Sequence, residues 1–330
     1  MKEALLSLEH LSIDYKIRGG YLSAVNDVSM DICQGEIFAV VGESGCGKST
    51  VAHSIMRLLS GGNAKIEGKI LFDGRDLMTC SEKEMEAVRG KEIGMIFQNP
   101  LDSLNPVYTV GNQVSEAIML DRVDKQEAMR QAVKLFQDVK MPDAQERAGS
   151  FPHELSGGMR QRVMIAMMLS RHPRLLIADE PTTALDVTIQ AQVLRLIKGL
   201  QEQYGTAMIL ITHDLGIVAE ICDDVAIMYA GCIMEYGSKE AIFTDARHPY
   251  TRGLFGCIPD LYADQSELRP IKGLMPDPAN LPQGCPFAPR CALAAERCRT
   301  EMPPPAEAAP GHMTRCFAPE ALSAGKGAAS

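Results

Sequence analysis

The chain contains the stretch Gly42-Glu43-Ser44-Gly45-Cys46-Gly47-Lys48-Ser49, which fits the phosphate-binding pattern G-x-x-x-x-G-K-[ST] at every fixed position. An apolar run at 37–41 precedes it and residues 50–56 follow it, so the context is a strand, a glycine-rich loop and a helix. Glycines let backbone N–H groups turn towards phosphate oxygens, and the helix that begins near Lys48 adds its positive end. We predict that Lys48 reaches the β- and γ-phosphates of a nucleotide and that the Ser49 hydroxyl holds Mg²⁺.

The composition argues against several classes of protein. The chain has 330 residues, which suggests about two domains, and its 46% of hydrophobic residues are ample for a core. A net charge of −9 and the absence of Trp disfavour a partner that is nucleic acid. The longest apolar run, at 163–169, is far shorter than the roughly 20 residues that span a bilayer, and residues 1–4 do not resemble a signal peptide. We expect a cytosolic chain, or one held at a membrane by its partners.

Hydrophobic periodicity predicts an α/β fold. Residues 5–41 are predicted to form short strands, with an alternation of period two at 25–32. Apolar runs at 175–179 and 208–212 predict parallel strands with a helix between them. Residues 225–236 are predicted to form a hairpin around a central Ala-Gly pair.

Two segments differ from this α/β pattern. Residues 112 to about 170 are poor in Gly and repeat apolar residues with a helical period, which predicts a helical insert. After about residue 258 the chain is rich in Pro, Gly and Cys, which indicates a loop-rich appendix, and residues 318–330 are predicted to be a disordered tail.

Two further motifs suit nucleotide chemistry. The apolar residues 175–178 end in Asp179-Glu180, at the strand edge where ligands bind in α/β folds. We predict that Asp179 supports Mg²⁺ and that Glu180 polarises the attacking water, although an ordinary acidic strand end would look the same. Ser156-Gly157-Gly158 precedes an amphipathic helix and makes a second helix N-terminus suited to phosphate. Two such ends serve one ATP only if two chains are arranged head to tail.

This combination resembles the ATP-binding subunits of ABC transporters. Their signature segment reads LSGGQ, and this chain has Met159 in place of the Gln. Gln98 is similar to the Q-loop glutamine, Asp186 to the D-loop aspartate and His213 to the switch histidine of that family. Tyr15 resembles the aromatic residue that stacks on adenine, although taken alone it reads as a strand residue. The order of the motifs along the chain supports the resemblance.

The resemblance, which spans residues 5 to about 258, implies an α/β P-loop ABC ATPase. Its parts would be a RecA-like core, an antiparallel β subdomain and a helical subdomain inserted at about 100–170. Residues 1–258 would form the nucleotide-binding domain and residues 259–330 a loop-rich C-terminal extension. ATP and Mg²⁺ would be its cofactors, with two ATP molecules sandwiched between two such chains.

The resemblance also implies a set of site residues. Catalysis would depend on Lys48, Gln98, Glu180 and His213, and Mg²⁺ would be held by Ser49, Gln98 and Asp179. The residues expected around the nucleotide are Tyr15, Gly42, Glu43, Ser44, Gly45, Cys46, Gly47, Lys48, Ser49, Thr50, Gln98, Ser156, Gly157, Gly158, Asp179 and Asp186.

Longer strings narrow the resemblance to the importers of dipeptides, oligopeptides and nickel. These strings are residues 98–106, 179–190, 248–251 and 284–291. They imply a dipeptide-permease D-type ATPase that works with a second, homologous ATPase, two membrane-spanning permease subunits and an extracytoplasmic solute-binding protein. The chain would then lie at the cytoplasmic face of the cell inner membrane, with no transmembrane segment of its own. A nickel importer, an exporter ATPase, a regulatory subunit that binds ATP without turnover and a soluble ABC ATPase are the alternatives.

Four cysteines of the C-terminal segment, Cys285, Cys291, Cys298 and Cys316, lie in a Pro-rich stretch with little core of its own. A segment with so small a core needs a cross-link, such as a disulfide or a bound metal, to be stable. Zinc is one alternative, although its usual C-x2–4-C pairs are absent, and free thiols are another; disulfides do not suit the cytosol. Irregular spacing suits an iron–sulfur cluster. The resemblance to this importer group, some of whose members carry a [4Fe–4S] cluster, favours that alternative.

Overall fold

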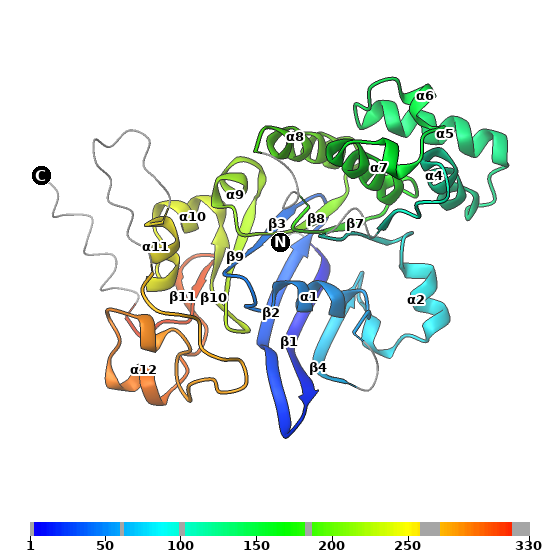
Figure 1. The fold of residues 1–330 in the computed structure, drawn as a ribbon. Helices are drawn as coiled ribbons and strands as arrows, with labels where there is room; N and C mark the ends of the chain where they lie inside the picture. The colour runs from blue at the N-terminus through cyan, green and yellow to red at the C-terminus, as the bar shows by residue number, and fades with distance from the viewer. Residues whose placement is uncertain (1–2, 60–62, 99–102, 182–186, 258–270, 319–330) are drawn as a thin grey trace, which may run out of the picture. The chain divides into compact units, whose positions relative to one another are not determined.

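The computed structural model describes residues 3–59, 63–98, 103–181, 187–257 and 271–318 (Figure 1). The chain divides into two compact units. The first unit comprises Met1–Leu5, Ile32–Ile37 and Thr79–Thr212, and the second comprises Leu6–Asp31, Phe38–Met78 and His213–Ser330. The domain boundary at residue 258 stays a prediction, and residues 319–330 of the predicted tail lie outside the described residues.

The first unit contains parallel strands that are buried along their whole length. They are β6 (Ile93–Ile96), β7 (Leu175–Asp179) and β8 (Ala207–Thr212), in the order β8-β7-β6. Burial on both faces requires continuous apolar runs instead of an alternation of apolar and polar residues, which is the pattern that the sequence has here. The strands predicted at 175–179 and 208–212 are confirmed.

The described part of the first unit also contains helices. They are α2 (Glu82–Val88), α4 (Val110–Met119), α5 (Lys125–Asp138), α6 (Ala144–Arg147), α7 (Gly157–Leu169) and α8 (Val187–Tyr204). Helices α4, α5 and α8 all pack against α7 (Figure 1). Helix α5 begins where the Asp124 carboxylate accepts from the N–H groups of Gln126 and Glu127, and its apolar stripe is buried. None of the helices in the described residues is long and apolar enough to cross a membrane.

An antiparallel sheet in the second unit contains β2 (Gly20–Cys33), β1 (Ala4–Ile17), β4 (Ala64–Phe72) and β5 (Arg75–Asp76), in that order. The buried side chains of β1 change parity, from Leu6 and Leu8 to Leu11 and Ile13. The pairing of β1 with β4 shifts its register between Glu9 and Ser12, which keeps both halves of the strand facing the core. The irregularity explains why polar neighbours interrupt the alternation of the sequence at this point.

The second unit also holds β3 (Ile37–Val41), β9 (Asp224–Tyr229), β10 (Cys232–Ser238), β12 (His312–Thr314) and β11 (Ala306–Ala309). β3 pairs with β9 in parallel, and β9 and β10 form the predicted hairpin. β12 pairs with β10 and β11 pairs with β12, so the C-terminal segment extends the sheet. The sequence analysis predicted only loops here, because strands this short carry no clear alternation. The helices of this unit are α1 (Lys48–Ile55), α9 (Leu215–Ile221), α10 (Lys239–Thr244), α11 (Pro249–Phe255) and α12 (Glu296–Thr300).

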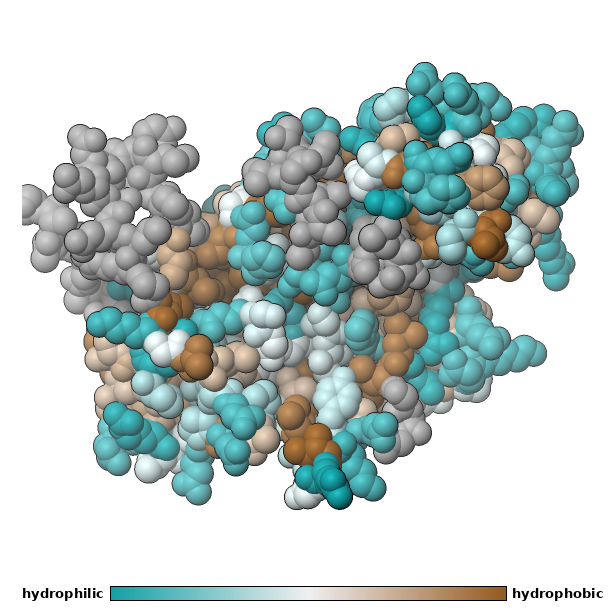
Figure 2. Space-filling view, viewed as in Figure 1, coloured by the Kyte–Doolittle hydropathy of each residue, from teal (hydrophilic) through white to brown (hydrophobic). Residues whose placement is uncertain are grey.

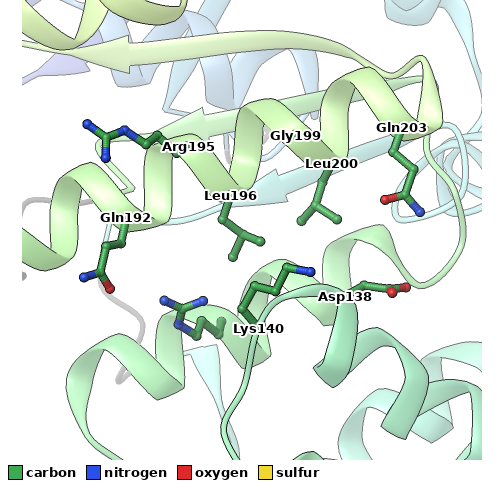
Figure 3. Close-up of a pocket in the computed structure, with 9 residues that line it drawn as sticks. Asp138, Lys140, Gln192, Arg195, Leu196, Gly199, Leu200 and Gln203 are labelled. Carbon is green, nitrogen blue, oxygen red and sulfur yellow. The ribbon is translucent and has the colours of Figure 1, made fainter.

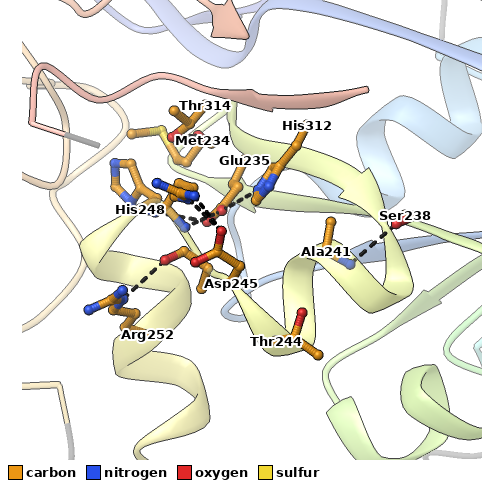
Figure 4. Close-up of polar contacts among 12 residues, drawn as sticks. Met234, Glu235, Ser238, Ala241, Thr244, Asp245, His248, Arg252, His312 and Thr314 are labelled. Carbon is orange, nitrogen blue, oxygen red and sulfur yellow. Dashed lines mark hydrogen bonds and ion pairs between the residues drawn. The ribbon is translucent and has the colours of Figure 1, made fainter. Parts of the chain in front are cut away.

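A buried carboxylate joins the C-terminal strands to the rest of the second unit. Glu235 of β10 is completely buried and lies 2.7 Å from Nε2 of His312 in β12 (Figure 4). It also accepts hydrogen bonds from the backbone N–H groups of Arg247 and His248, at the start of α11. Buried carboxylates are stable only with such partners, so the network ties three elements together.

The buried imidazole of His248, beside this network, predicts that the stability of the fold decreases in acid. Burial lowers the pKa of His248 from 6.5 to about 4, although the charge of Glu235 opposes the change. Between these two pH values the unfolded chain binds a proton at His248 and the folded chain does not. The titration of His248 should therefore lower the free energy of unfolding by about 3 kcal/mol as the pH drops from 6.5 to 4.

The measurement is denaturant unfolding of the wild type and of His248→Asn between pH 4 and 7. The Nδ1 atom of His248 caps α11 by accepting from the N–H of Tyr250 at 3.1 Å, and an Asn amide oxygen can do the same without titrating. The variant should lose less stability in acid than the wild type. Parallel curves for the two proteins would contradict the prediction.

Candidate functional site

The glycine-rich stretch 42–47 connects β3 to α1 in the second unit, as the motif predicted. Gly47 is the N-cap of α1 and has a φ of 106°, and a Cβ there would lie 2.4 Å from the carbonyl oxygen of Ala24. A Cβ at Gly42 would lie 2.1 Å from the carbonyl oxygen of Met228. Both positions therefore admit only glycine, the first for its backbone angle as well as for space.

Lys48 lies over this loop. Its side chain is buried, with 5% of the residue exposed, and Nζ donates to the carbonyl oxygens of Gly42 at 2.9 Å and Glu43 at 3.0 Å. The ammonium group is thus held at the concave side of the loop, where a phosphate-binding lysine is needed. The Cys46 thiol is buried in the same loop, and burial raises its pKa, so it is a packing residue instead of a nucleophile.

In the first unit, Gln98 and Glu180 lie together at the C-terminal ends of β6 and β7. Nε2 of Gln98 donates to Oε2 of Glu180 at 2.9 Å, although the two residues are 82 positions apart. Glu180 has a φ of 45°, an angle that is rare for a residue with a side chain and is often found at functional sites. Its N–H donates to the carbonyl oxygen of Ile211 in β8, which holds the backbone in this conformation. Asp179, directly before it, is buried.

The signature segment lies at the start of α7 in the same unit. Ser156 is the N-cap, and its Oγ accepts from the N–H of Met159 at 3.3 Å. Gly157 and Gly158 form the first turn of the helix, and Ser156 is exposed. The serine thus caps an exposed helix N-terminus, a position that suits an anion. Met159 donates only its backbone N–H to this cap, so the substitution for Gln leaves the cap intact.

The other predicted site residues lie in several different elements of the chain. Tyr15 lies in β1 opposite Ala64 and is half-buried, and His213 directly follows β8 and is exposed. Asp186 lies outside the described residues. By the division of the chain, Tyr15, the phosphate loop and His213 belong to the second unit, whereas Gln98, the signature segment, Asp179 and Glu180 belong to the first. Their roles stay predictions.

The sequence analysis did not predict that the C-terminal third of the chain touches the phosphate loop. The N–H of Glu43 donates to the hydroxyl of Tyr250 at 3.1 Å, and Arg290 forms an ion pair with the carboxylate of Glu43. Tyr250 belongs to the string 248–251 that resembles the peptide-importer group, but nothing local to that string points to Glu43.

The C-terminal cysteines lie near one another in the second unit. The pKa of Cys285 is raised to about 12, mainly by burial and with smaller contributions from Cys291 and Cys298. Burial likewise raises the pKa of Cys316, with smaller contributions from Cys291 and Cys298. Nevertheless, in the described part of the chain no three or more Cys, His or acidic residues are placed to hold a metal ion. The predicted metal site is therefore not confirmed.

A cavity of about 550 Å³ lies in the first unit beside α8 (Figure 3). Its lining carries the cations Lys140, Arg162 and Arg195 and the carboxylate Asp138. No described residue that was predicted to contact the nucleotide lines it. The cavity is therefore distinct from the predicted nucleotide-binding residues of the described chain.

Comparison with known proteins identifies the family. Residues 25–183 match a family model described as ABC transporter, and residues 234–298 match one described as oligopeptide/dipeptide transporter, C-terminal region. The oligopeptide transport ATP-binding protein OppD of Haemophilus influenzae is 48% identical over 89% of this chain and 91% of its own length. The dipeptide transport ATP-binding protein DppD of Bacillus subtilis is 47% identical over 96% of this chain and 95% of its own. The chain belongs to the peptide-transport ATP-binding proteins of the ABC family.

Solved structures agree with this assignment. A dimeric post-hydrolysis state of the ATP-binding cassette MJ0796, bound to ADP and Pi, matches with a TM-score of 0.64 and 26% identity over 71% of this chain and 98% of that one. The structure of cbiO1 from Clostridium perfringens, part of an ABC transporter complex, gives the same TM-score with 28% identity over 74% and 92% of the two chains. The predicted fold, a P-loop ABC ATPase, is confirmed, and this ABC protein is an ATP hydrolase.

Proposed function

We propose that this chain hydrolyses ATP to power the import of dipeptides or oligopeptides across the cytoplasmic membrane. The observation that carries the proposal is that the match to peptide transporters extends to residues 234–298, beyond the cassette at 25–183. A soluble ABC ATPase or an exporter leaves this C-terminal region unexplained. Peptide import accounts for both parts of the chain.

The residues described above suit ATP hydrolysis. The phosphate loop would hold the triphosphate through its backbone N–H groups and Lys48. Ser49 and Asp179 offer the hard oxygen ligands that Mg²⁺ prefers, and the bound ion would neutralise developing charge on the phosphates. Glu180 would polarise the attacking water, and the hydrogen bond from Gln98 would hold the Glu180 carboxylate in one orientation.

A second ATPase chain would complete each site. The exposed N-terminus of α7, with Ser156 as its cap, would face the ATP bound by the partner, while His213 would contact the γ-phosphate. Tyr15 would stack on adenine, and Asp186 would lie at the interface of the two ATPases. We propose that the partner is a homologous ATPase instead of a second copy, and that the complex contains two permease subunits and an extracytoplasmic solute-binding protein.

We propose that the permease subunits dock on the first unit. Val107 is 70% exposed and Leu120 is 67% exposed, and Tyr108 and Met119 are exposed as well. In the space-filling view, apolar residues lie among hydrophilic ones over the helical group α4–α7 (Figure 2). A cavity of about 640 Å³ lined by Tyr108 and Met119 lies beside them. Exposed apolar residues around a cavity suit a helix from a protein partner, which would place this chain at the cytoplasmic face of the inner membrane.

We propose that the four cysteines hold a [4Fe–4S] cluster. The backbone N–H of Cys285 donates to the carbonyl oxygen of Cys298 at 2.8 Å, a contact between two of the four that supports this proposal. The spacing of the four cysteines is irregular and lacks the C-x2–4-C pairs that are usual for zinc, which favours a cluster over a single zinc ion. Cys285, Cys291, Cys298 and Cys316 would supply the four thiolates, and the cluster would act as the staple of a segment with few core residues.

The proposed function predicts loss of peptide uptake without loss of nickel uptake. Cells that lack this chain should accumulate little of a labelled dipeptide or oligopeptide, because the permease has no source of energy. The wild-type chain should restore uptake, and Lys48→Ala should not. Nickel accumulation, measured in the same cells, is the control. Peptide uptake that persists while nickel uptake falls would overturn the assignment of substrate class.

A further inference from the structure

Glu43, the second residue of the phosphate loop, is held at three points within the second unit. Its carbonyl oxygen accepts from Nζ of Lys48, and its N–H donates to the hydroxyl of Tyr250. Its carboxylate oxygens lie 2.9 and 3.0 Å from Nη1 of Arg290. Two of the three contacts thus come from residues more than 200 positions later in the chain.

Arg290 is itself fixed by contacts on every nitrogen of its guanidinium group. Nε donates to the carbonyl oxygen of Lys272 at 3.1 Å and Nη2 to that of Ile271 at 3.4 Å. Nη1, which faces Glu43, also donates to the hydroxyl of Tyr229 at 3.2 Å. Only 7% of the side chain is exposed. The guanidinium group is therefore held beside Glu43 with little freedom to move, whereas the side chain of an exposed arginine is flexible.

An aromatic cluster of Tyr229, Tyr250 and Phe287 supports these contacts. The rings of Tyr229 and Tyr250 lie 4.6 Å apart between centroids, and the ring of Phe287 lies 5.3 Å from each. The guanidinium carbon of Arg290 lies 5.7 Å from the centre of the Tyr229 ring. All three aromatic residues are buried, so the cluster forms a rigid support for both hydroxyls and for Arg290.

The negative charge of Glu43 bears on the binding of a nucleotide. A carboxylate on a phosphate-binding loop repels the nucleotide unless a cation neutralises it or holds it away from the phosphates. Lys48 is needed for the phosphates themselves. Arg290 is the cation that the structure pairs with the Glu43 carboxylate.

We propose that Arg290 is a positioning residue of the phosphate loop, which neutralises and orients Glu43 and thereby raises the affinity of the chain for ATP and ADP. The inference rests on the proposed function, because it assumes that the loop binds a nucleotide. It also gives the C-terminal extension a direct influence on nucleotide binding, since Arg290 belongs to the turn between Cys285 and Cys291.

The test is equilibrium binding of ATP and ADP to the purified full-length chain. Arg290→Ala should weaken both nucleotides about tenfold, because it leaves the Glu43 carboxylate without its cation. Adding Glu43→Gln to that variant should restore most of the affinity, since the uncompensated charge is then gone. Arg290→Lys, which keeps the charge, should fall between the wild type and Arg290→Ala. A purely structural role for Arg290 predicts no rescue by Glu43→Gln.

The matched control is Arg297→Ala, in α12 of the same C-terminal segment. Arg297 forms an exposed ion pair with Glu301, and its loss should leave nucleotide affinity unchanged. Unchanged affinity in Arg290→Ala, or a loss that Glu43→Gln does not repair, would overturn the inference. If Arg290→Ala does not fold, Arg290→Gln removes the same charge, and a wild-type affinity in that variant would overturn the inference equally. Failure of the wild type to bind ATP, with Lys48→Ala no different, would instead refute the nucleotide site.

Discussion

Replacing Glu180 by Gln is expected to slow ATP hydrolysis by a factor of about 10² to 10⁴ while ATP still binds. The proposed general base loses its charge in this variant but keeps its size. The amide can still accept the hydrogen bond that Gln98 donates to Glu180, so the local geometry should persist. The φ of 45° at Glu180 is also retained, because it depends on the backbone bond to Ile211. The loss should therefore report on the chemical step alone.

The measurements are steady-state release of phosphate and equilibrium binding of ATP. ATP affinity should match that of the wild type within about twofold, because Glu180 acts on the attacking water and not on the phosphates. Glu202→Gln, at an exposed position of α8, is the control and should hydrolyse ATP at the normal rate. Normal turnover in Glu180→Gln would remove this residue from its assigned role. A regulatory subunit that binds ATP without turnover would show no hydrolysis in the wild type either.

Chain purified without oxygen is expected to contain about four irons and four sulfides and to absorb broadly in the visible region. Cys298→Ser should lose most of the iron, because three thiolates cannot hold the complete cluster. Loss of the staple should also increase the rate at which proteases cut the segment after residue 271. This second measurement reports on the fold of the segment without depending on ATPase activity.

The control for the cluster is Cys257→Ser, since Cys257 is exposed and lies outside the group of four. Its iron content should equal that of the wild type. One zinc per chain, or a colourless sample without metal, would contradict the cluster. In that case the four cysteines would be reduced thiols or a zinc site. The assignment to the peptide transporters would be unaffected, because it depends on the family matches at residues 25–183 and 234–298.

Much of the fold could be predicted because it is encoded in short stretches of chain. Continuous apolar runs predicted β7 and β8, since strands buried on both faces need such runs. The shift of register in β1 could not be predicted in the same way. It depends on the pairing of β1 with β4, whose irregularity lets Leu6 and Leu11 both face the core although they are an odd number of positions apart. The short strands β11 and β12 were missed because they carry no clear alternation and because β12 pairs with β10, about 80 positions earlier.

The sequence by itself determined the phosphate loop, the strand that leads into it and the family, because each depends on residue types at fixed spacings. Only the tertiary structure decided which distant residues contact one another at the proposed site. Gln98 reaches Glu180 across 82 positions, and Arg290 reaches Glu43 across 247. The physical reason is that local preferences fix backbone conformation over a few residues, whereas these contacts arise from the packing of whole elements. No pattern near Arg290 reveals that its partner is a carboxylate on the phosphate loop.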